Sequence, residues 1–176
     1  MDVSHEQLLP YDPKWKEEYE KEKNKLENVF GEEIIDIQHI GSTAIPNLSA
    51  KPIVDIGVLL KTDTVAESFI EPLKEIGYVF NVEGHTKFGS PERHFLRKGN
   101  PTKFHLSLGY ADRGSFWKRQ ILFRDYLRTH QKEREEYQKI KEQGLRVDPS
   151  GADAYIENKS AFIWRVLEKA GFIKTW

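Results

Sequence analysis

The chain has 176 residues, a formal net charge of −1 and no cysteine. This length fits one ordinary domain with a sizeable core, and the absence of cysteine excludes disulfides and thiolate metal sites. No apolar run approaches the length of a membrane span, and the N-terminus lacks the core of a signal peptide. We therefore expect a soluble cytoplasmic protein without a membrane partner.

The first element predicted along the chain is a helix that ends at Gly31. Asp12 is a suitable N-cap, and Pro13 suits the first helical position. Two apolar, β-prone stretches follow, 34–40 and 53–60, and they flank a loop rich in Gly, Ser, Thr, Pro and Asn. This pattern predicts a strand, a polar loop and a second strand.

The rest of the chain predicts a divided helix, three strands and three helices. Thr62 or Asp63 can cap the divided helix, Pro72 kinks or splits it, and Gly77 ends it. The later elements are the strands 78–83, 93–97 and 103–110 and the helices 115–129, 132–143 and 152–170, the second of which Gly144 ends. This order predicts one α/β or α+β domain over 1–176, with a mixed sheet of about five strands, helices on one face and a helical C-terminal part.

The loop between the first two strands carries the most informative pattern. It begins with Gly41 and Ser42, where backbone N–H groups can approach an anion. Asp55 follows within the apolar second strand, where a carboxylate is costly to bury unless it binds a metal, pairs with a charge or accepts hydrogen bonds. Two interpretations stay open: a site for phosphate and metal, or a turn before a strand whose Asp bonds to loop backbone.

Two histidines could complete a metal site with Asp55. His39 ends the first strand, and His105 lies on the polar face of a later strand in which Phe104 and Leu106 alternate with it. Two His and one carboxylate form a known ligand set for a divalent metal, here Mg²⁺ or Mn²⁺. Nothing in the spacing forces the three together, so a structural role for each histidine stays open. Period-two alternation predicts that Asp55 and His105 face one cavity with Gly41 and Ser42.

A basic segment offers candidates for phosphate binding. Residues 87–128 hold ten Lys or Arg against three Asp or Glu, a balance that suits phosphate groups better than a long nucleic acid. Within it, Arg97 ends the predicted strand 93–97, and Arg124 either binds a triphosphate or pairs with a carboxylate. Lys51, before Pro52, could reach a phosphate as a point charge. The alternative is a basic helix face balanced by acidic neighbours.

A Gly-Ser, a spacer of about a dozen residues and an Asp in an apolar strand resemble the core motif of the DNA polymerase β-like nucleotidyltransferase superfamily. The stretch from His39 to Val58 resembles the GrpB family more specifically. The likeness spans nearly the whole chain and continues in four further motifs: Tyr11-Asp12-Pro13-Lys14-Trp15, Phe95-Leu96-Arg97-Lys98-Gly99, Phe104-His105-Leu106 and Phe123-Arg124-Asp125-Tyr126-Leu127-Arg128. The resemblance implies a nucleotidyltransferase-like fold and does not fix a reaction.

The chain departs from the superfamily pattern at one position. A second acid ordinarily follows two residues after the first, and this chain has Gly57 there, which offers no ligand atom. The resemblance places the superfamily's third acid at His105. Glu83 and Glu92 are candidate replacement acids or, alternatively, solvated strand ends.

The resemblance and the residues together predict a metal-dependent nucleotidyltransferase-like protein that acts on a nucleoside triphosphate and a small-molecule acceptor. Asp55 would be the catalytic residue. Phosphate would be bound by Gly41, Ser42, Lys51, Arg97 and Arg124, and a divalent metal by Asp55, His39 and His105. One alternative is a non-catalytic nucleotide-binding or regulatory module that has lost the second acid. Another is hydrolysis or a different phosphate reaction at a His/Asp metal site.

Overall fold

The computed structural model describes residues 7–80, 92–147 and 153–173. Its strands are β1 (Asp36–Ile40), β2 (Val54–Leu60), β3 (Tyr78–Phe80), β4 (Arg93–Lys98) and β5 (Phe104–Tyr110). Its helices are α1 (Lys14–Phe30), α2 (Asp63–Ser68), α3 (Ile70–Glu75), α5 (Phe116–Thr129), α6 (Gln131–Val147) and α7 (Asp153–Lys169), with short 3₁₀ turns η1 (Gly31–Glu33) and η2 (Ser42–Ala44). None of these helices combines the length and the apolar character that crossing a membrane requires.

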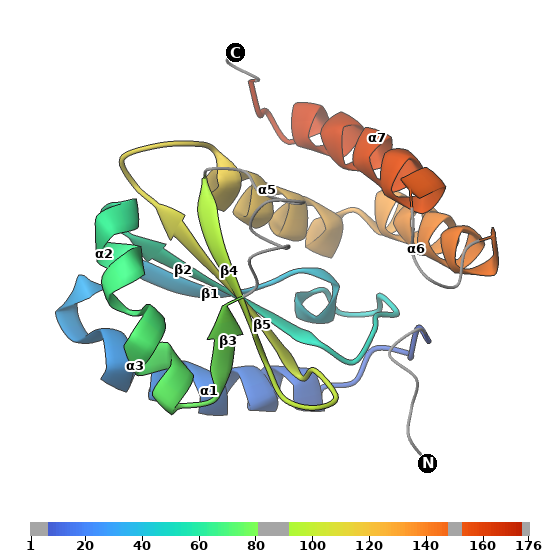
Figure 1. Cartoon of the computed structure of the whole chain (residues 1–176). Coiled ribbons are helices and arrows are strands. Elements are labelled where there is room, and N and C mark those ends of the chain that lie inside the picture. Colours follow the sequence, from blue (N-terminus) through green and yellow to red (C-terminus); the bar gives the residue numbers. More distant parts are fainter. Residues whose placement is uncertain (1–6, 81–91, 148–152, 174–176) are drawn as a thin grey trace.

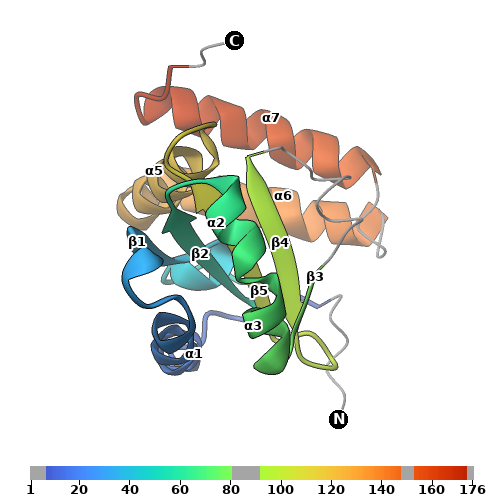
Figure 2. The same ribbon diagram turned by 60° about the vertical axis from the view of Figure 1, so that its left-hand side comes forward.

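The strands form one five-stranded sheet in the order β1-β2-β5-β4-β3. β2 and β5 pair in parallel, and the other three pairs are antiparallel. The predicted mixed sheet is therefore confirmed. Helices α1 to α3 cover one face, and α5 to α7 form the helical C-terminal part (Figure 1). In the turned view, α2 and α3 lie in front of the strands and α6 lies behind them (Figure 2).

The main core lies between the sheet and helices α1 to α3. Along β2, four apolar side chains at alternate positions are buried there: Val54, Ile56, Val58 and Leu60. Burying each apolar side chain of this kind contributes about 1.5–3 kcal/mol. Because successive side chains of a strand point to opposite faces, Asp55 and Gly57 face away from this core. The pairing with β5 sets Asp55 opposite His105 and Gly57 opposite Ser107.

A second, smaller core joins the Gly-Ser loop to the C-terminal helices. Ile45 and Leu48 from the loop are fully buried against apolar side chains of α5, α6 and α7, namely Leu127, Tyr137, Phe162 and Val166. The loop is therefore fastened on one side to the sheet and on the other to the helical part. This double attachment fixes the position of Ser42, which begins η2.

Most predicted boundaries agree with the structure, and two differ. The divided helix breaks at Phe69, which ends α2 and begins α3. Pro72 lies in the first turn of α3, and its missing N–H cannot bond back into α2, so the break falls one turn before the proline. The helix predicted to end at Gly144 continues to Val147. Packing of α6 on α7 outweighs the cost of about 1 kcal/mol for an interior glycine. Residues 81–83 of the predicted third strand lie outside the described residues.

Candidate functional site

The Gly-Ser turn follows β1 directly and lies against Asp55 of β2. Gly41 has φ +72°, a conformation that glycine adopts readily, and a Cβ at this position would collide with Asp55 Oδ2. The turn is closed by backbone hydrogen bonds from Ala44 N–H to the Gly41 carbonyl (3.2 Å) and from Ile45 N–H to the Ser42 carbonyl (3.1 Å). Glycine is therefore required here for two reasons, the backbone angle and the close approach of the carboxylate.

Asp55 and His105 form a hydrogen-bonded pair on neighbouring parallel strands. His105 Nδ1 lies 3.0 Å from Asp55 Oδ1, and the side chains are 27% and 34% exposed. When Nδ1–H donates to the carboxylate, Nε2 keeps its lone pair and can accept a proton or bind a metal. The imidazole is also positioned by an edge contact with Phe95, whose ring centroid is 5.0 Å away. Asp55 therefore orients the imidazole of His105 so that Nε2 can act as a general base.

One cavity of about 240 Å³ brings this pair together with the Gly-Ser turn, and we call it the Asp55 cavity. Its polar walls come from Ser42, Thr43, Lys51, Asp55, His105, Lys141 and Lys159. Four of the predicted site residues thus share one cavity, and Gly41 abuts Asp55 beside it. Three lysines against one aspartate give this cavity a positive balance that suits a phosphate chain.

Lys141 was not among the predicted site residues. It projects from α6 and is 3% exposed. Its Nζ donates to Ser42 Oγ (3.3 Å) and to the Ser49 carbonyl oxygen. Burial, together with the neighbouring charge of Lys159, lowers the pKa of Lys141 to about 7. An ammonium group that is desolvated but lies beside a hydroxyl gains most when an anion enters the cavity.

The sequence holds one signal that could have identified Lys141. It follows the buried Tyr137 by four residues and therefore lies on the same face of α6, over the aromatic ring at 5.1 Å from its centroid. Lysines of a helix usually lie on its solvent-exposed face, so a lysine on the buried face indicates a specific partner. That partner, Ser42, lies 99 residues earlier in the chain.

The structure does not bring His39 to Asp55 and His105. His39 pairs with Ile56 in the sheet and therefore points to the α1 side, where its ring stacks on Tyr19 at 4.9 Å. Its Nε2 is 2.9 Å from Thr43 Oγ1, and burial lowers the pKa of His39 to about 4, so the ring is neutral. Across the described residues, no three His, Cys, Asp or Glu side chains are grouped to hold a metal ion.

The position expected for a second acid is covered by an aromatic ring. A Cβ at Gly57 would lie 3.0 Å from Trp117 Cζ3 and 3.2 Å from Ile40 Cδ1. Trp117 belongs to α5, which crosses the sheet at this point. Ser107, opposite Gly57, accepts a hydrogen bond from Arg93 (2.8 Å). A carboxylate two residues after Asp55 would therefore require the indole to move.

The other predicted basic residues lie outside this cavity. Arg97 is paired with His105 in the sheet and shares its face, but its exposed guanidinium lies 5.9 Å from the centroid of the Phe95 ring. Arg124 is 6% exposed and lines a different cavity, beyond η2. Its ion pair with Asp125 (2.8 Å) agrees with the alternative that Arg124 pairs with a carboxylate rather than with a triphosphate. The replacement acid Glu92 pairs with Arg119 (2.6 Å), and Glu83 lies outside the described residues.

The GrpB family profile, described as GrpB protein, matches residues 6–169. The chain belongs to the GrpB family. The glutamate-rich protein GrpB of Alkalihalophilus pseudofirmus is 34% identical over 167 residues, covering 92% of this chain and 94% of that protein. The UPF0157 protein YqkA of Bacillus subtilis is 36% identical over 170 residues, and the chain spans only 48% of its length. The crystal structure of GrpB from Enterococcus faecalis superposes with a TM-score of 0.82 at 32% identity, covering 93% of this chain and 96% of that one.

Proposed function

We propose that the chain binds a nucleoside triphosphate in the Asp55 cavity and transfers its nucleotidyl group to a small-molecule acceptor. The observation that carries the proposal is the meeting of a Gly-Ser turn, a carboxylate and three lysines in one cavity. The resemblance of Gly41, Ser42 and Asp55 to the nucleotidyltransferase motif supports the same function. Two lysines, Lys141 and Lys159, come from the C-terminal helices and extend the phosphate site beyond the motif itself.

The residues of the cavity suit a divalent metal only when the nucleotide supplies most of its ligands. Mg²⁺ is commonly bound by one or two carboxylates together with phosphate oxygens and water. Asp55 Oδ1 is engaged by His105, and Oδ2 is the oxygen that Gly41 approaches. Asp55 would hold Mg²⁺ or Mn²⁺, and the bound metal would neutralise charge on the phosphates.

The other side chains of the cavity would bind the phosphates and accept the proton of the acceptor. Ser42 Oγ and the ammonium of Lys141 are hydrogen-bonded to each other and would both turn to a phosphate oxygen. Lys51 and Lys159 add positive charge to the cavity wall. His105, oriented by Asp55, would accept the proton of an acceptor hydroxyl at Nε2.

A second candidate function is nucleotide binding without transfer. Trp117 covers the position where the superfamily pattern has its second acid, so the chain provides one carboxylate where two-metal enzymes use several. A regulatory or sensing module would retain the phosphate site and not need a second metal. Both candidates require the same binding event, and they differ only in whether pyrophosphate is released.

Calorimetry with ATP, GTP, CTP and UTP, each with and without Mn²⁺, tests the binding event. We expect Asp55→Asn to remove the part of the affinity that depends on Mn²⁺, and Lys141→Gln to weaken binding with or without the metal. Arg97→Gln tests whether this exposed arginine contributes. Lys61→Gln, at the far end of β2 from Asp55, is the matched control and should leave the affinity unchanged. If Asp55→Asn and Lys141→Gln bind every nucleotide as the parent does, the proposed site is refuted.

Pyrophosphate release then separates the two candidates. The protein is incubated with the nucleotide that binds best, Mn²⁺ and a mixture of small hydroxyl and amine acceptors. Release that is lost in both Asp55→Asn and His105→Gln supports the transferase. Binding without release supports the module.

A further inference from the structure

A second and larger cavity, of about 520 Å³, lies on the other side of η2 between α1, β1 and α5. We call it the Arg128 cavity. Its charged walls are Lys16, Lys23, Arg124 and Arg128, against a single carboxylate, Glu20. His39 also lines it and adds no charge, because burial lowers the pKa of this imidazole to about 4. The cavity is therefore positive, and it shares no charged residue with the Asp55 cavity.

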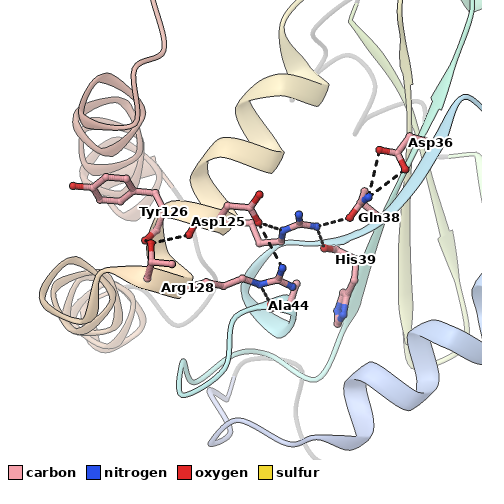
Figure 3. A network of polar contacts seen from close by, with 9 residues as sticks. Asp36, Gln38, His39, Ala44, Asp125, Tyr126 and Arg128 are labelled. Atoms are coloured by element: carbon pink, nitrogen blue, oxygen red, sulfur yellow. Dashed lines mark hydrogen bonds and ion pairs between the residues drawn. The ribbon is translucent and has the colours of Figure 1, made fainter.

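Hydrogen bonds hold both arginines of this cavity in place. Arg124 donates from Nη1 to Gln38 Oε1 and to the His39 carbonyl, each at 2.9 Å, and from Nε to Asp125 Oδ1 at 2.8 Å. Arg128 donates from Nε to the Ala44 carbonyl at 2.9 Å (Figure 3). Among the described residues, Nη2 of neither arginine makes a hydrogen bond. Because the rest of each guanidinium is held in place, its Nη2 has a defined direction and can donate to a carboxylate or phosphate oxygen.

The positive charge of the two arginines is only partly neutralised, because both pair with the same carboxylate. They lie one turn apart on α5, and both pair with Asp125, at 2.8 Å for Arg124 and 3.5 Å for Arg128. Burial lowers the pKa of the Arg128 guanidinium, and the charge of Arg124 lowers it further. Lys16, on the α1 wall, makes no ion pair with any described residue. Holding these cations together is costly unless another anion is present.

We infer that the Arg128 cavity is a second ligand site, which binds a small molecule carrying a carboxylate or phosphate group. Arg124 and Arg128 hold the oxyanion, and Lys16 faces them from α1. The inference goes beyond the proposed nucleotide site and does not depend on it, because the cationic residues of the two cavities are different.

The position of this site gives its ligand a direct contact with the Gly-Ser turn. Thr43 lines both cavities, and Arg128 holds the carbonyl of Ala44 in the same turn. The wall between the two sites is thus a single turn of 3₁₀ helix, Ser42–Ala44. An acceptor or an effector bound in the Arg128 cavity would rest against the backbone that carries Ser42.

Calorimetric titration with citrate and with inorganic phosphate, at low salt and in a buffer without other polyanions, tests the inference. We expect binding that weakens as NaCl is added. Arg128→Gln should weaken it by about tenfold or more, the amount expected when one charge-assisted hydrogen bond is lost. Because Arg128 also supports Ala44, the second variant is Lys16→Gln, which removes an exposed side chain that makes no ion pair with any described residue and should weaken binding severalfold. Arg128→Lys, which keeps the charge and loses the planar guanidinium, should fall between the parent and Arg128→Gln.

The matched control is Lys61→Gln, because Lys61 is exposed and lines neither cavity. Citrate and phosphate affinities that fall in Arg128→Gln and Lys16→Gln but not in Lys61→Gln support the second site. No measurable binding, or binding that falls only in Lys51→Gln and Lys141→Gln, would overturn it and leave a single anion site beside Asp55. Failure of the nucleotide proposal would instead show as unchanged nucleotide affinity in the Asp55 and Lys141 variants.

Discussion

Replacing Lys141 by Met should change how stability depends on pH. The pKa of Lys141 is about 7 in the folded chain, against an ordinary value of 10.5. Between these two values the unfolded chain binds the proton and the folded chain largely does not, so stability rises with pH across this window. Below about pH 7 both states carry the proton and the slope disappears. Above about pH 10.5 neither state carries it, and the slope disappears again.

The size of the effect follows from the difference between the two pKa values. Each unit of pKa difference corresponds to about 1.36 kcal/mol, so the unfavourable contribution of Lys141 is about 4 kcal/mol at pH 7.5 and about 2 kcal/mol at pH 9. The parent chain should therefore gain about 2 kcal/mol from this residue between the two pH values. Lys141→Met has a similar length and no titration, and its apolar side chain can pack on Tyr137. It should lack this gain.

Urea unfolding followed by tryptophan fluorescence, in a buffer without phosphate, measures the free energy of unfolding of the parent chain and of Lys141→Met. The quantity to compare is the parent free energy minus that of Lys141→Met at pH 7.5 and at pH 9, because titration of all other groups cancels in this difference. Lys61→Met, at an exposed lysine, serves as the control and should give a difference that does not change with pH. A constant difference for Lys141→Met as well would show that Lys141 is not desolvated beside Ser42, and the reasoning would fail.

Three further predictions concern the same site. Gly41→Ala should lower the free energy of unfolding by about 1–3 kcal/mol in urea titrations, because the positive φ and the collision with Asp55 both oppose a Cβ; a variant as stable as the parent would contradict the close packing of the turn. Gly57→Asp should destabilise the chain by about 1–3 kcal/mol through the contact with Trp117 and should not strengthen Mn²⁺ binding, whereas tighter Mn²⁺ binding in calorimetry would show that the indole moves aside. Nucleotide binding should take up a proton at Lys141 above pH 7, seen as a binding enthalpy that depends on the ionisation enthalpy of the buffer, and Lys141→Gln should remove this dependence.

Local sequence patterns were sufficient to predict the strands and the strand faces on which Asp55 and His105 lie. The alternation in β2 and β5 depends only on neighbouring residues, and it places Asp55 and His105 on the faces that the structure shows. The Gly-Ser turn was equally local, because glycine marks the position where the backbone needs a positive φ. These features were predictable because each is determined within a few residues of the chain.

The remaining features depend on pairings between distant segments. His39 and Asp55 each lie on a β-strand, but only the register, in which Ile40 is opposite Asp55, shows that His39 faces the other side of the sheet. Trp117 over Gly57 joins residues from two elements that are remote in the sequence. Lys141 lies in a highly charged helix and could be distinguished from its solvated neighbours only by the face that α6 buries. Sequence periodicity gives the faces of an element and does not give its partners.

The Asp55 cavity lies where two separately packed parts of the chain meet. Ser42 and Asp55 belong to the sheet and its first loop, whereas Lys141 and Lys159 come from helices that pack in the second core. A phosphate chain bound between them would neutralise lysines on one part and rest on the turn of the other. Ligand binding would therefore add a bridge beside the apolar contacts of Ile45 and Leu48, which already hold these parts together. The lysines of the C-terminal helices, which lie outside the Gly-Ser and Asp motif, would thus make this cavity better suited to an extended anion than to a metal ion alone.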